Sequence, residues 1–256
     1  MKQSAPLCVI ILAAGKGTRM KSSRAKVLHE VFYRPMLHHV LDSVTPLSPD
    51  STIVIVGHQK EAVTAILDNY EVTCCEQREQ NGTGHAVLCA RSLLADFHGT
   101  LMIINGDAPL LLTEHLAQMI DTHAASSAAR TITTTSLDDP TNYGRVISDS
   151  TGAVQAVVEE KDADELQRAV KEINAGIYIG DAGFIFGALD RVTTDNAQGE
   201  MYLTDIVSIG VGDGLKVNKF AHPHPNHVLG VNSQAELAQA QRELSGRRNN
   251  ELMAMG

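Results

Sequence analysis

The sequence lacks any hydrophobic run long enough to cross a membrane. The apolar run Leu7–Ala14 has eight residues, whereas a transmembrane helix needs about 20. Gly15 and Lys16 follow it where a secretory signal would have a cleavage site with small residues. None of the few cysteines has the C-x-x-C spacing of a metal or redox site, and we expect all of them to be reduced thiols in a cytoplasmic protein without a membrane partner. The cysteines are Cys8, Cys74, Cys75 and Cys89.

Acidic residues are absent from the first 29 positions, although the whole chain contains 30 of them and has a net charge of −9. The same segment contains several Lys and Arg residues and the glycine-rich stretch I-L-A-A-G-K-G-T-R-M-K, Ile11–Lys21. Positive charge beside glycines suggests that this loop binds an anion. Nucleic-acid binding needs a broad basic face, which the acidic remainder of the chain argues against. We therefore expect a small anionic ligand and no nucleic acid.

Strands and helices are expected to alternate in the first half of the chain. Short apolar runs that end at turn residues predict buried strands, and apolar residues at helical spacing predict the helices between them. Such alternation indicates an α/β fold, a Rossmann-like, mostly parallel sheet with helices on both faces. The expected strands are Leu7–Ala13, Ser51–Gly57, Glu71–Cys75 and Leu101–Ile104. Four helices are expected: one that starts at Pro35, one over Glu61–Asn69, one that starts at Gly84 and one over Thr113–His123.

The sequence pattern changes near Arg130, where β-branched residues become frequent. Four further strands are expected, and those within Thr141–Gly180 form a lobe added to the same sheet. Ser233 and Glu236 form a capping box that predicts the start of a long C-terminal helix. The strand candidates are Arg130–Leu137, Arg145–Ser148, Ala153–Glu159 and Glu172–Gly180.

The glycine loop does not match the common nucleotide-binding motifs. The phosphate-binding G-x-x-x-x-G-K-[ST] is absent, and a dinucleotide fingerprint would need glycine at Met20 and an acidic residue after the second strand. The spacing of Lys16, Arg19 and Lys26 instead allows these cations to surround several phosphates, so a triphosphate is the natural ligand. A solvated basic loop without a ligand is the alternative.

Asp107 follows the predicted strand Leu101–Ile104, and ligands of open parallel sheets bind at the carboxyl ends of the strands. A carboxylate at that edge, near a phosphate-binding loop, predicts a Mg²⁺ ligand. The alternative is that Asp107 only stabilises the turn before Pro109.

Together these motifs resemble the sugar-1-phosphate nucleotidylyltransferases. The resemblance includes L-A-A-G-K-G-T-R-M with Lys26, N-G-D at Asp107, and further motifs over Leu12–Asn232. It is most specific for the amino-terminal domain of the bacterial bifunctional N-acetylglucosamine-1-phosphate uridylyltransferases. The further motifs are A-K-V-L-H, Q-R-E-Q-N-G-T-G-H-A, D-D-P-T-N-Y-G-R, V-E-E-K-D-A, E-I-N-A-G-I, N-A-Q-G-E-M-Y-L-T-D-I and G-V-N.

The resemblance implies a nucleotide-diphospho-sugar transferase fold and a reaction between UTP and N-acetylglucosamine 1-phosphate that gives UDP-N-acetylglucosamine and pyrophosphate. Mg²⁺ is the implied cofactor, with Asp107 and Asn232 as its ligands. Arg19, Lys26 and Asp107 are the implied catalytic residues. Uracil recognition is implied for Leu12, Ala13, Ala14, Gly15, Gln77, Gly82 and Thr83. Asn105 and Gly106, beside Asp107, and the sugar-binding Gly144, Glu159, Asn174 and Tyr202 complete the implied substrate site, which also includes Lys26 and Asn232.

Some of these roles have alternatives. Tyr202 could simply pack in the core, Asn232 could cap the following helix, and Gln77 could be a surface residue. Two positions depart from the family pattern: Ala25 replaces a frequent proline, which suggests a more mobile loop, and Asn105 replaces a frequent aromatic residue. A related enzyme for another sugar or base, a silent nucleotide-sugar binding module and a dinucleotide oxidoreductase are the rival functions.

The resemblance also predicts the domain organisation. Residues 1–232 are expected to form the nucleotidylyltransferase domain, with a nucleotide-binding half (1–125) and a sugar-binding half (126–232), and residues 233–256 a linker helix. The acetyltransferase β-helix of the family has no counterpart here, so we expect neither acetyl transfer nor a trimer. Finally, H-P-H-P-N-H at His222–His227 resembles a metal cluster, but prolines should hold it extended with diverging ligands, as a connector into a strand before Asn232.

Overall fold

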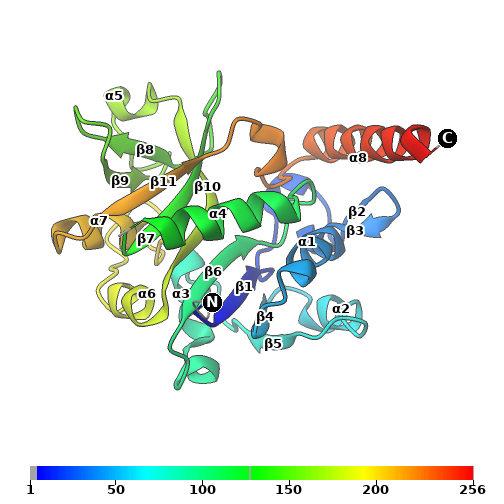
Figure 1. Ribbon diagram of the computed structural model, residues 1–256, viewed down its shortest axis with the longest axis horizontal. Coiled ribbons are helices and arrows are strands. Elements are labelled where there is room, and N and C mark those ends of the chain that lie inside the picture. The colour runs from blue at the N-terminus through cyan, green and yellow to red at the C-terminus, as the bar shows by residue number, and fades with distance from the viewer. Residues whose placement is uncertain (1–4, 127, 256) are drawn as a thin grey trace.

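A nine-stranded mixed sheet forms the centre of the molecule in the computed structural model, which describes residues 5–126 and 128–255. The order is β11–β7–β10–β6–β1–β4–β5, and β8 and β9 attach beside β10 (Figure 1). The strands are β1 (Leu7–Leu12), β4 (Ser51–Val56), β5 (Thr73–Glu76), β6 (Thr100–Asn105), β7 (Arg130–Ser136), β8 (Arg145–Ser148), β9 (Val154–Val158), β10 (Glu172–Asp181) and β11 (Val217–Ala221). A small ladder pairs β2 (Glu30–Val31) with β3 (Arg34–Pro35).

The parallel half of the sheet consists of β5, β4, β1 and β6. Its central strand β1 is fully buried from Cys8 to Ile11, as expected for a strand with helices on both faces. The register pairs Leu12 with both Ile55 and Asn105, so the carboxyl ends of the three central strands share one edge. The strands predicted in the first half of the chain are confirmed, with ends that differ by one or two residues.

The other half of the sheet is mainly antiparallel. Strand β10 pairs antiparallel with β6, β7 and β8, whereas β11 pairs parallel with β7. The β10–β7 register shifts between Asn174 and Tyr178, and Gly176 within this irregularity has φ +78°, a conformation that glycine adopts without strain. Together β8 and β9 form a hairpin beside β10 (Figure 1), which places the predicted added lobe on the same sheet.

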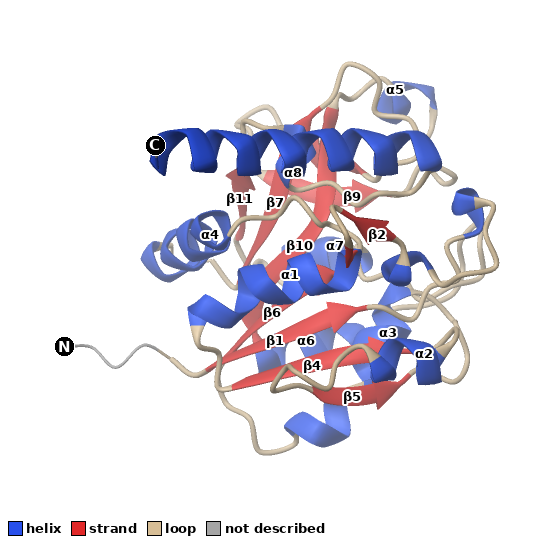
Figure 2. Cartoon of the chain, turned by 90° about the vertical axis from the view of Figure 1, so that its right-hand side faces the viewer, coloured by secondary structure: helices blue, strands red, loops and turns tan. Residues whose placement is uncertain are grey.

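Helices cover both faces of the sheet (Figure 2). Side chains of α1, α2 and α4 form a hydrophobic core with one face, and side chains of α3, α6 and α7 form a second core with the other face. This arrangement confirms the predicted fold class. The helices are α1 (Met36–Val44), α2 (Lys60–Ala65), α3 (Thr83–Cys89), α4 (Thr113–Ala125), α5 (Glu165–Arg168), α6 (Ala182–Leu189), α7 (Asp205–Gly212) and α8 (Gln234–Met255). Single 3₁₀ turns lie at Thr18–Met20 (η1), Lys26–Leu28 (η2), Thr45–Leu47 (η3), Arg91–Leu94 (η4) and Pro225–His227 (η5).

The long helix α8 begins at the predicted capping box, where Ser233 Oγ accepts a hydrogen bond from the Glu236 backbone N–H at 3.2 Å. The expected strand before Asn232 is wrong, because Val228–Val231 forms a turn and loop. A backbone bond from Val231 N–H to Asp107 O, at 2.8 Å, ties this loop to the turn that follows β6. Across the described residues, we find no helix with the length and hydrophobicity needed to cross a bilayer.

Candidate active site

The glycine loop after β1 folds back on Lys26. Gly17 has φ +64°, and a Cβ there would lie only 2.5 Å from Lys26 Cβ, so glycine is required for both reasons. The side chain of Gln59 holds the far end of the loop, since its Oε1 accepts from the Ala25 N–H at 2.8 Å and its Nε2 donates to Ser23 O at 2.7 Å. The loop therefore has a fixed path that directs Lys26 toward the end of the sheet.

Lys26 joins the two predicted metal ligands. Its ammonium forms an ion pair with Asp107 Oδ2 and donates to Asn232 Oδ1 at 2.8 Å. Arg19 Nη2 donates to the same Asn232 oxygen at 2.9 Å. Residues from three distant parts of the chain thus converge at one point, as the sequence predicted. The Lys26 and Asp107 side chains are only 16% and 13% exposed, which strengthens their interaction relative to a surface pair.

Asp107 also has an oxygen that suits a cation. Its Oδ1 is buried and has no hydrogen-bond partner among the described residues, and buried polar atoms are rarely left without one. Gly230 lies so close that a Cβ there would collide with this oxygen. The Asn232 side chain is not a helix cap, because Nδ2 donates to Gly230 O at 2.9 Å and Oδ1 faces Lys26. These oxygen donors fit a hard divalent cation such as Mg²⁺.

A cavity of about 490 Å³ opens beside the glycine loop. Its walls are the end of β1, the glycine loop and the turn that begins α3, so it contains the residues predicted to recognise uracil. The predicted residues that line it are Leu12, Ala13, Ala14, Gly15, Lys26, Gln77, Gly82, Thr83, Asn105 and Asp107.

Gln77 is 3% exposed, and its amide nitrogen is hydrogen-bonded within the protein. Nε2 lies 3.0 Å from Gly82 O and 3.1 Å from His85 Nδ1. An amide NH₂ has two hydrogens, so Gln77 offers the cavity its carbonyl oxygen only. A free glutamine amide could offer a base both a donor and an acceptor, but here Gln77 offers a single acceptor, and the bond to His85 helps to orient it.

A second cavity of about 290 Å³ lies against β10 and the β8–β9 hairpin. It is lined by the predicted sugar-binding Gly144, Glu159 and Asn174, and by Arg19 and Asn232. The two cavities share five lining residues, so they meet at the Lys26–Asp107 pair. The shared residues are Leu12, Lys26, Thr83, Asn105 and Asp107.

Glu159 lies deep in the second cavity, where Thr204 Oγ1 donates to its Oε1 at 3.1 Å. Burial raises the pKa of this carboxyl group above its ordinary value of 4.5, with smaller contributions from the like charges of Asp205 and Asp162, and the Thr204 bond opposes the shift. A buried acceptor favours a ligand that brings hydroxyl donors. A sugar is such a ligand.

Two predicted residues lie outside both cavities. The ring of Tyr202 is 6% exposed and its hydroxyl donates to Asp162 Oδ2 at 3.1 Å, so the structure favours the core-packing alternative over contact with a sugar. Gly106 packs against the core, where a Cβ would lie 3.1 Å from Leu12 O and 3.2 Å from Leu37 Cδ1. Its contribution is to place Asp107 after β6.

Comparison with known proteins identifies the family. Residues 8–224 match the nucleotidyl transferase family. The chain belongs to this family. It is 51% identical over 256 residues to the bifunctional protein GlmU of Desulfotalea psychrophila, covering 100% of this chain and 76% of the relative. The GlmU proteins of Corynebacterium aurimucosum and Thermobifida fusca are each 44% identical, covering 96% and 100% of this chain but 52% and 54% of the relatives.

The chain spans about three quarters of the first relative and about half of the other two. These matches confirm the predicted family and the predicted type of enzyme, a nucleotidyltransferase related to GlmU. They favour the uridylyltransferase interpretation over a related enzyme for another sugar or base.

Sequence reasoning missed several residues that line the cavities of this nucleotidyltransferase. Gly176 is one: a Cβ there would collide with Asn105 Nδ2, so the glycine makes room for the residue before Gly106. Tyr178 is another, and its buried hydroxyl accepts from Asn174 Nδ2 at 2.6 Å. The positive φ at Gly176 could have been suspected from A-G-I within a strand, whereas no local pattern indicates which face Tyr178 occupies. The other missed lining residues include Asn142, Tyr143, Leu203 and Thr204.

Proposed function

We propose that this nucleotidyltransferase transfers UMP from UTP to N-acetylglucosamine 1-phosphate, giving UDP-N-acetylglucosamine and pyrophosphate. The observation that carries the proposal is the meeting of the two cavities at Lys26 and Asp107. A nucleotide in the larger cavity and a sugar phosphate in the smaller one would both present phosphate to the same pair of residues. The resemblance of the motifs supplies the identity of the base and the sugar.

The reaction needs no protein base. A phosphate monoester has a second pKa near 6, so its oxygen is largely ionised at neutral pH and can attack the α-phosphorus of UTP in line, with pyrophosphate leaving. The difficulty is bringing two anions together. Lys26 and Arg19, both bonded to Asn232 Oδ1, are placed to neutralise that charge and to orient the phosphates, and positioning with charge stabilisation supplies most of the rate.

We further propose that Asp107 and Asn232 hold Mg²⁺. The support is Asp107 Oδ1, which is buried without a hydrogen-bond partner among the described residues, and Asn232 Oδ1, which accepts from the Lys26 ammonium that also pairs with Asp107 Oδ2. When bound, the ion would add positive charge to the phosphates of the nucleotide. The Lys26 ammonium competes with the ion for Asn232 Oδ1 and for the charge of the Asp107 carboxylate. It therefore holds the two ligands together and neutralises Asp107 before substrate arrives.

Pyrophosphate release tests the proposed reaction. Purified protein with Mg²⁺ is assayed with UTP, CTP or dTTP against a panel of sugar 1-phosphates that includes N-acetylglucosamine, glucose and galactose derivatives. We expect the UTP and N-acetylglucosamine pair to give the highest kcat/KM. A different preferred pair would establish the alternative, a related nucleotidylyltransferase, and no release with any pair would overturn the proposal.

Replacing Gln77 by Ala is expected to reduce base selectivity. The Gln77 carbonyl oxygen can accept from uracil N3–H, but it faces an acceptor at N3 of cytosine. Losing one buried hydrogen bond costs about 1.4 kcal/mol, a factor of about ten, so kcat/KM for UTP should fall about tenfold and CTP should change little. Kinetics with both nucleotides measure this. The exposed Gln118→Ala variant is the control, and an equal loss with CTP would contradict the assignment.

Replacing Glu159 by Gln is expected to stabilise the protein at neutral pH while weakening sugar binding. Burial raises the Glu159 pKa above 4.5, so the folded state holds a proton more tightly than the unfolded state. The wild type therefore loses stability as the pH rises from the unfolded-state pKa through the higher folded-state pKa. The variant should therefore melt above the wild type at pH 8, and the difference should vanish below pH 4.5. KM for the sugar phosphate should rise about tenfold.

Thermal unfolding at a series of pH values measures the change in stability of Glu159→Gln, and initial rates measure its KM for the sugar phosphate. Glu165→Gln, an exposed change in α5, is the matched control for both. A lower melting temperature for Glu159→Gln than for the wild type at pH 8 would contradict burial as the cause of the raised Glu159 pKa.

The other predictions from the sequence stay predictions. They are the division into residues 1–125, 126–232 and 233–256, the cytoplasmic location, and the absence of acetyl transfer and of a trimer. Fractionation, an acetyl-transfer assay and the mass in solution would test them.

A further inference from the structure

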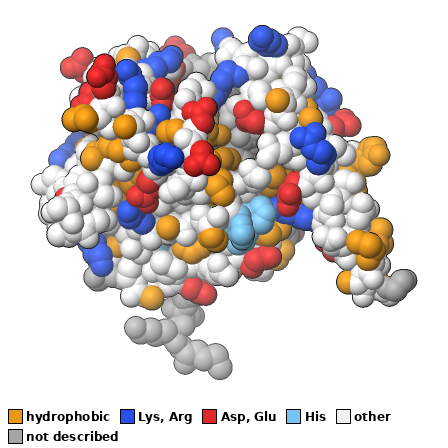
Figure 3. All heavy atoms as spheres, turned by 90° about the horizontal axis from the view of Figure 1, so that it is seen from above, with side chains coloured by type: hydrophobic (Ala, Val, Ile, Leu, Met, Phe, Trp, Pro, Cys, Tyr) orange, Lys and Arg blue, Asp and Glu red, His pale blue; other side chains and the backbone are white. Residues whose placement is uncertain are grey.

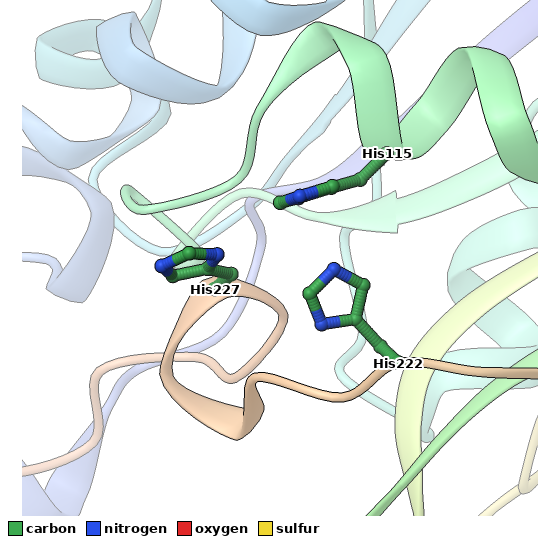
Figure 4. Close-up of side chains that lie close together, drawn as sticks. All are labelled: His115, His222 and His227. Carbon is green, nitrogen blue, oxygen red and sulfur yellow. The ribbon is translucent and has the colours of Figure 1, made fainter.

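Three histidines from separate parts of the chain converge outside the two cavities. His115 lies in the first turn of α4, His222 follows β11, and His227 ends the η5 turn. Their potential ligand nitrogens all lie within 4.8 Å of one another, and the ring centroids of His115 and His222 are 4.2 Å apart. Figure 4 shows the three rings directed toward a common space, and Figure 3 shows histidines gathered at the surface beside the arm that α8 forms.

Each of these three rings has a nitrogen that could bind a metal ion. His115 Nδ1 and His227 Nδ1 are buried and have no hydrogen-bond partner in the described part of the chain. His222 is 4% exposed, and its Nδ1 lies 3.0 Å from His224 O. A metal-binding histidine usually donates its other ring nitrogen to a backbone carbonyl or carboxylate. His222 has this arrangement when Nδ1 carries the proton. Its Nδ1 also lies 3.1 Å from the His224 backbone nitrogen, so in either tautomer Nδ1 faces the His224 backbone and Nε2 is the nitrogen that faces a ligand.

Burial favours the neutral form of the three rings, which is the form that binds a metal. Burial lowers the pKa of His115 to about 4, helped by His222 and His227, and burial also lowers the pKa values of His222 and His227. The charges that face the cluster are mixed. Arg247 opposes a cation, but its Nε lies 3.4 Å from Glu243 Oε1, and the same carboxylate oxygen is 3.7 Å from His227 Nε2. Glu114 adds a further negative charge near His115.

We propose that His115, His222 and His227 bind one transition-metal ion of the Zn²⁺ type. Imidazole nitrogens are ligands that Zn²⁺, Co²⁺ and Ni²⁺ share, whereas Mg²⁺ prefers oxygen. With Zn–N bonds of about 2.0–2.1 Å, tetrahedral ligands lie about 3.4 Å apart. The nitrogens lie within 4.8 Å of one another, so they need to approach by up to about 1.4 Å. Rotation of the side chains provides this, and solvent supplies the fourth ligand.

The ion would connect the two segments that carry the proposed Mg²⁺ ligands. His222 and His227 precede the loop that leads through Gly230 to Asn232, whereas His115 lies just beyond the turn that follows Asp107. Within the protein alone, Val231 N–H to Asp107 O, at 2.8 Å, is a backbone link between these segments. A bound ion would add a second link and restrict the loop that positions Asn232. Metal binding at the histidines does not depend on the proposed reaction.

The sequence pattern argues against this site, for a reason that the structure partly contradicts. The prolines were expected to keep His222–His227 extended, but η5 turns the chain at Pro225–His227 and brings His227 back toward His222. His224 is exposed and does not belong to the group of mutually close nitrogens, although its ring centroid lies 5.3 Å from that of His227. The third member, His115, is more than 100 positions away, so no local motif could include it.

Metal titration of the purified full chain tests the proposal. The protein is stripped with a chelator, returned to buffer with millimolar Mg²⁺ so that the Asp107–Asn232 oxygens are occupied, and titrated with Zn²⁺ against a chromophoric chelator. Co²⁺ in a parallel titration reports the geometry through its visible absorption. The variants are His115→Gln and His222→Gln, with His224→Gln as the matched control from the same loop. Melting curves without metal establish that each variant folds.

We expect one equivalent of Zn²⁺, a tetrahedral Co²⁺ spectrum and unchanged binding in His224→Gln. Each of the other variants should bind at least about 100-fold more weakly, because loss of a ligand exceeds the 10- to 100-fold effect of losing a supporting group. Hydrogen exchange of residues 223–231 should slow with Zn²⁺ in the wild type and not in His115→Gln. Absent binding, equal binding in His115→Gln and His224→Gln, or unchanged exchange would overturn the proposal.

Discussion

Asp107→Asn is expected to lower turnover by about 10²–10³ while the protein remains folded. The substitution preserves the shape of the side chain but removes the charge that pairs with Lys26 and the stronger of the two proposed metal ligands. Loss of one well-placed electrostatic group at a reacting centre has an effect of this size. Steady-state pyrophosphate release at saturating UTP, sugar phosphate and Mg²⁺ measures it.

The control for this variant is Asp121→Asn, an exposed carboxylate of α4, which should retain turnover within about twofold of the wild type. If Asp107→Asn kept more than half of the wild-type turnover at saturating Mg²⁺, Asp107 would not belong to the metal site.

Lys26→Ala is expected to reduce turnover by a similar factor, about 10²–10³, with little change in the preference for UTP over CTP. Lys26 lines both cavities, so its charge is available to the phosphates of both substrates. The same variant should bind Mg²⁺ more tightly in the absence of nucleotide, because the ammonium no longer occupies Asp107 Oδ2 and Asn232 Oδ1. Calorimetric titration with Mg²⁺ separates this gain from the loss in turnover.

Arg24→Ala is the matched control, since Arg24 lies in the same loop, is about half exposed and pairs only with Glu30 at 3.5 Å among the described residues. Altered base preference with normal turnover in Lys26→Ala would place Lys26 near the base. Weaker Mg²⁺ binding would show that Lys26 supports the metal ligands rather than competing with them.

The parallel strands and the positions of Lys26 and Asp107 could be predicted because their signals are local. The strand β1 is a continuous apolar run that ends in glycine, and Asp107 follows another such run, so parallel pairing of β1 with β6 brings the two ends to one edge. Gly144, Glu159 and Asn174 required the resemblance, since nothing in the residues alone shows that β8, β9 and β10 enclose a cavity.

Other features depend on contacts between distant residues and could not be predicted. The hydrogen bonds of Gln77 Nε2 to Gly82 O and His85 Nδ1 fix which part of the amide faces the ligand. These bonds form only because the turn before α3 brings both partners close to Gln77. Tyr202 was assigned to the sugar site, but its bond to Asp162 depends on how two loops meet. The apolar run before Asn232 looks like a strand, yet its Val231 N–H binds Asp107 O and no neighbouring strand is available to it among the described residues.

The bond between Ala25 and Gln59 links two positions that would otherwise vary freely. Proline, frequent before the phosphate-binding lysine in the resembling family, has no N–H to offer Gln59 Oε1, whereas alanine relies on that 2.8 Å bond to hold the loop. Ala25 already has φ −55°, which a proline ring would accept. Relatives with proline at this position therefore do not need glutamine at the position of Gln59. Chains with alanine should retain that glutamine, so we expect the two positions to covary.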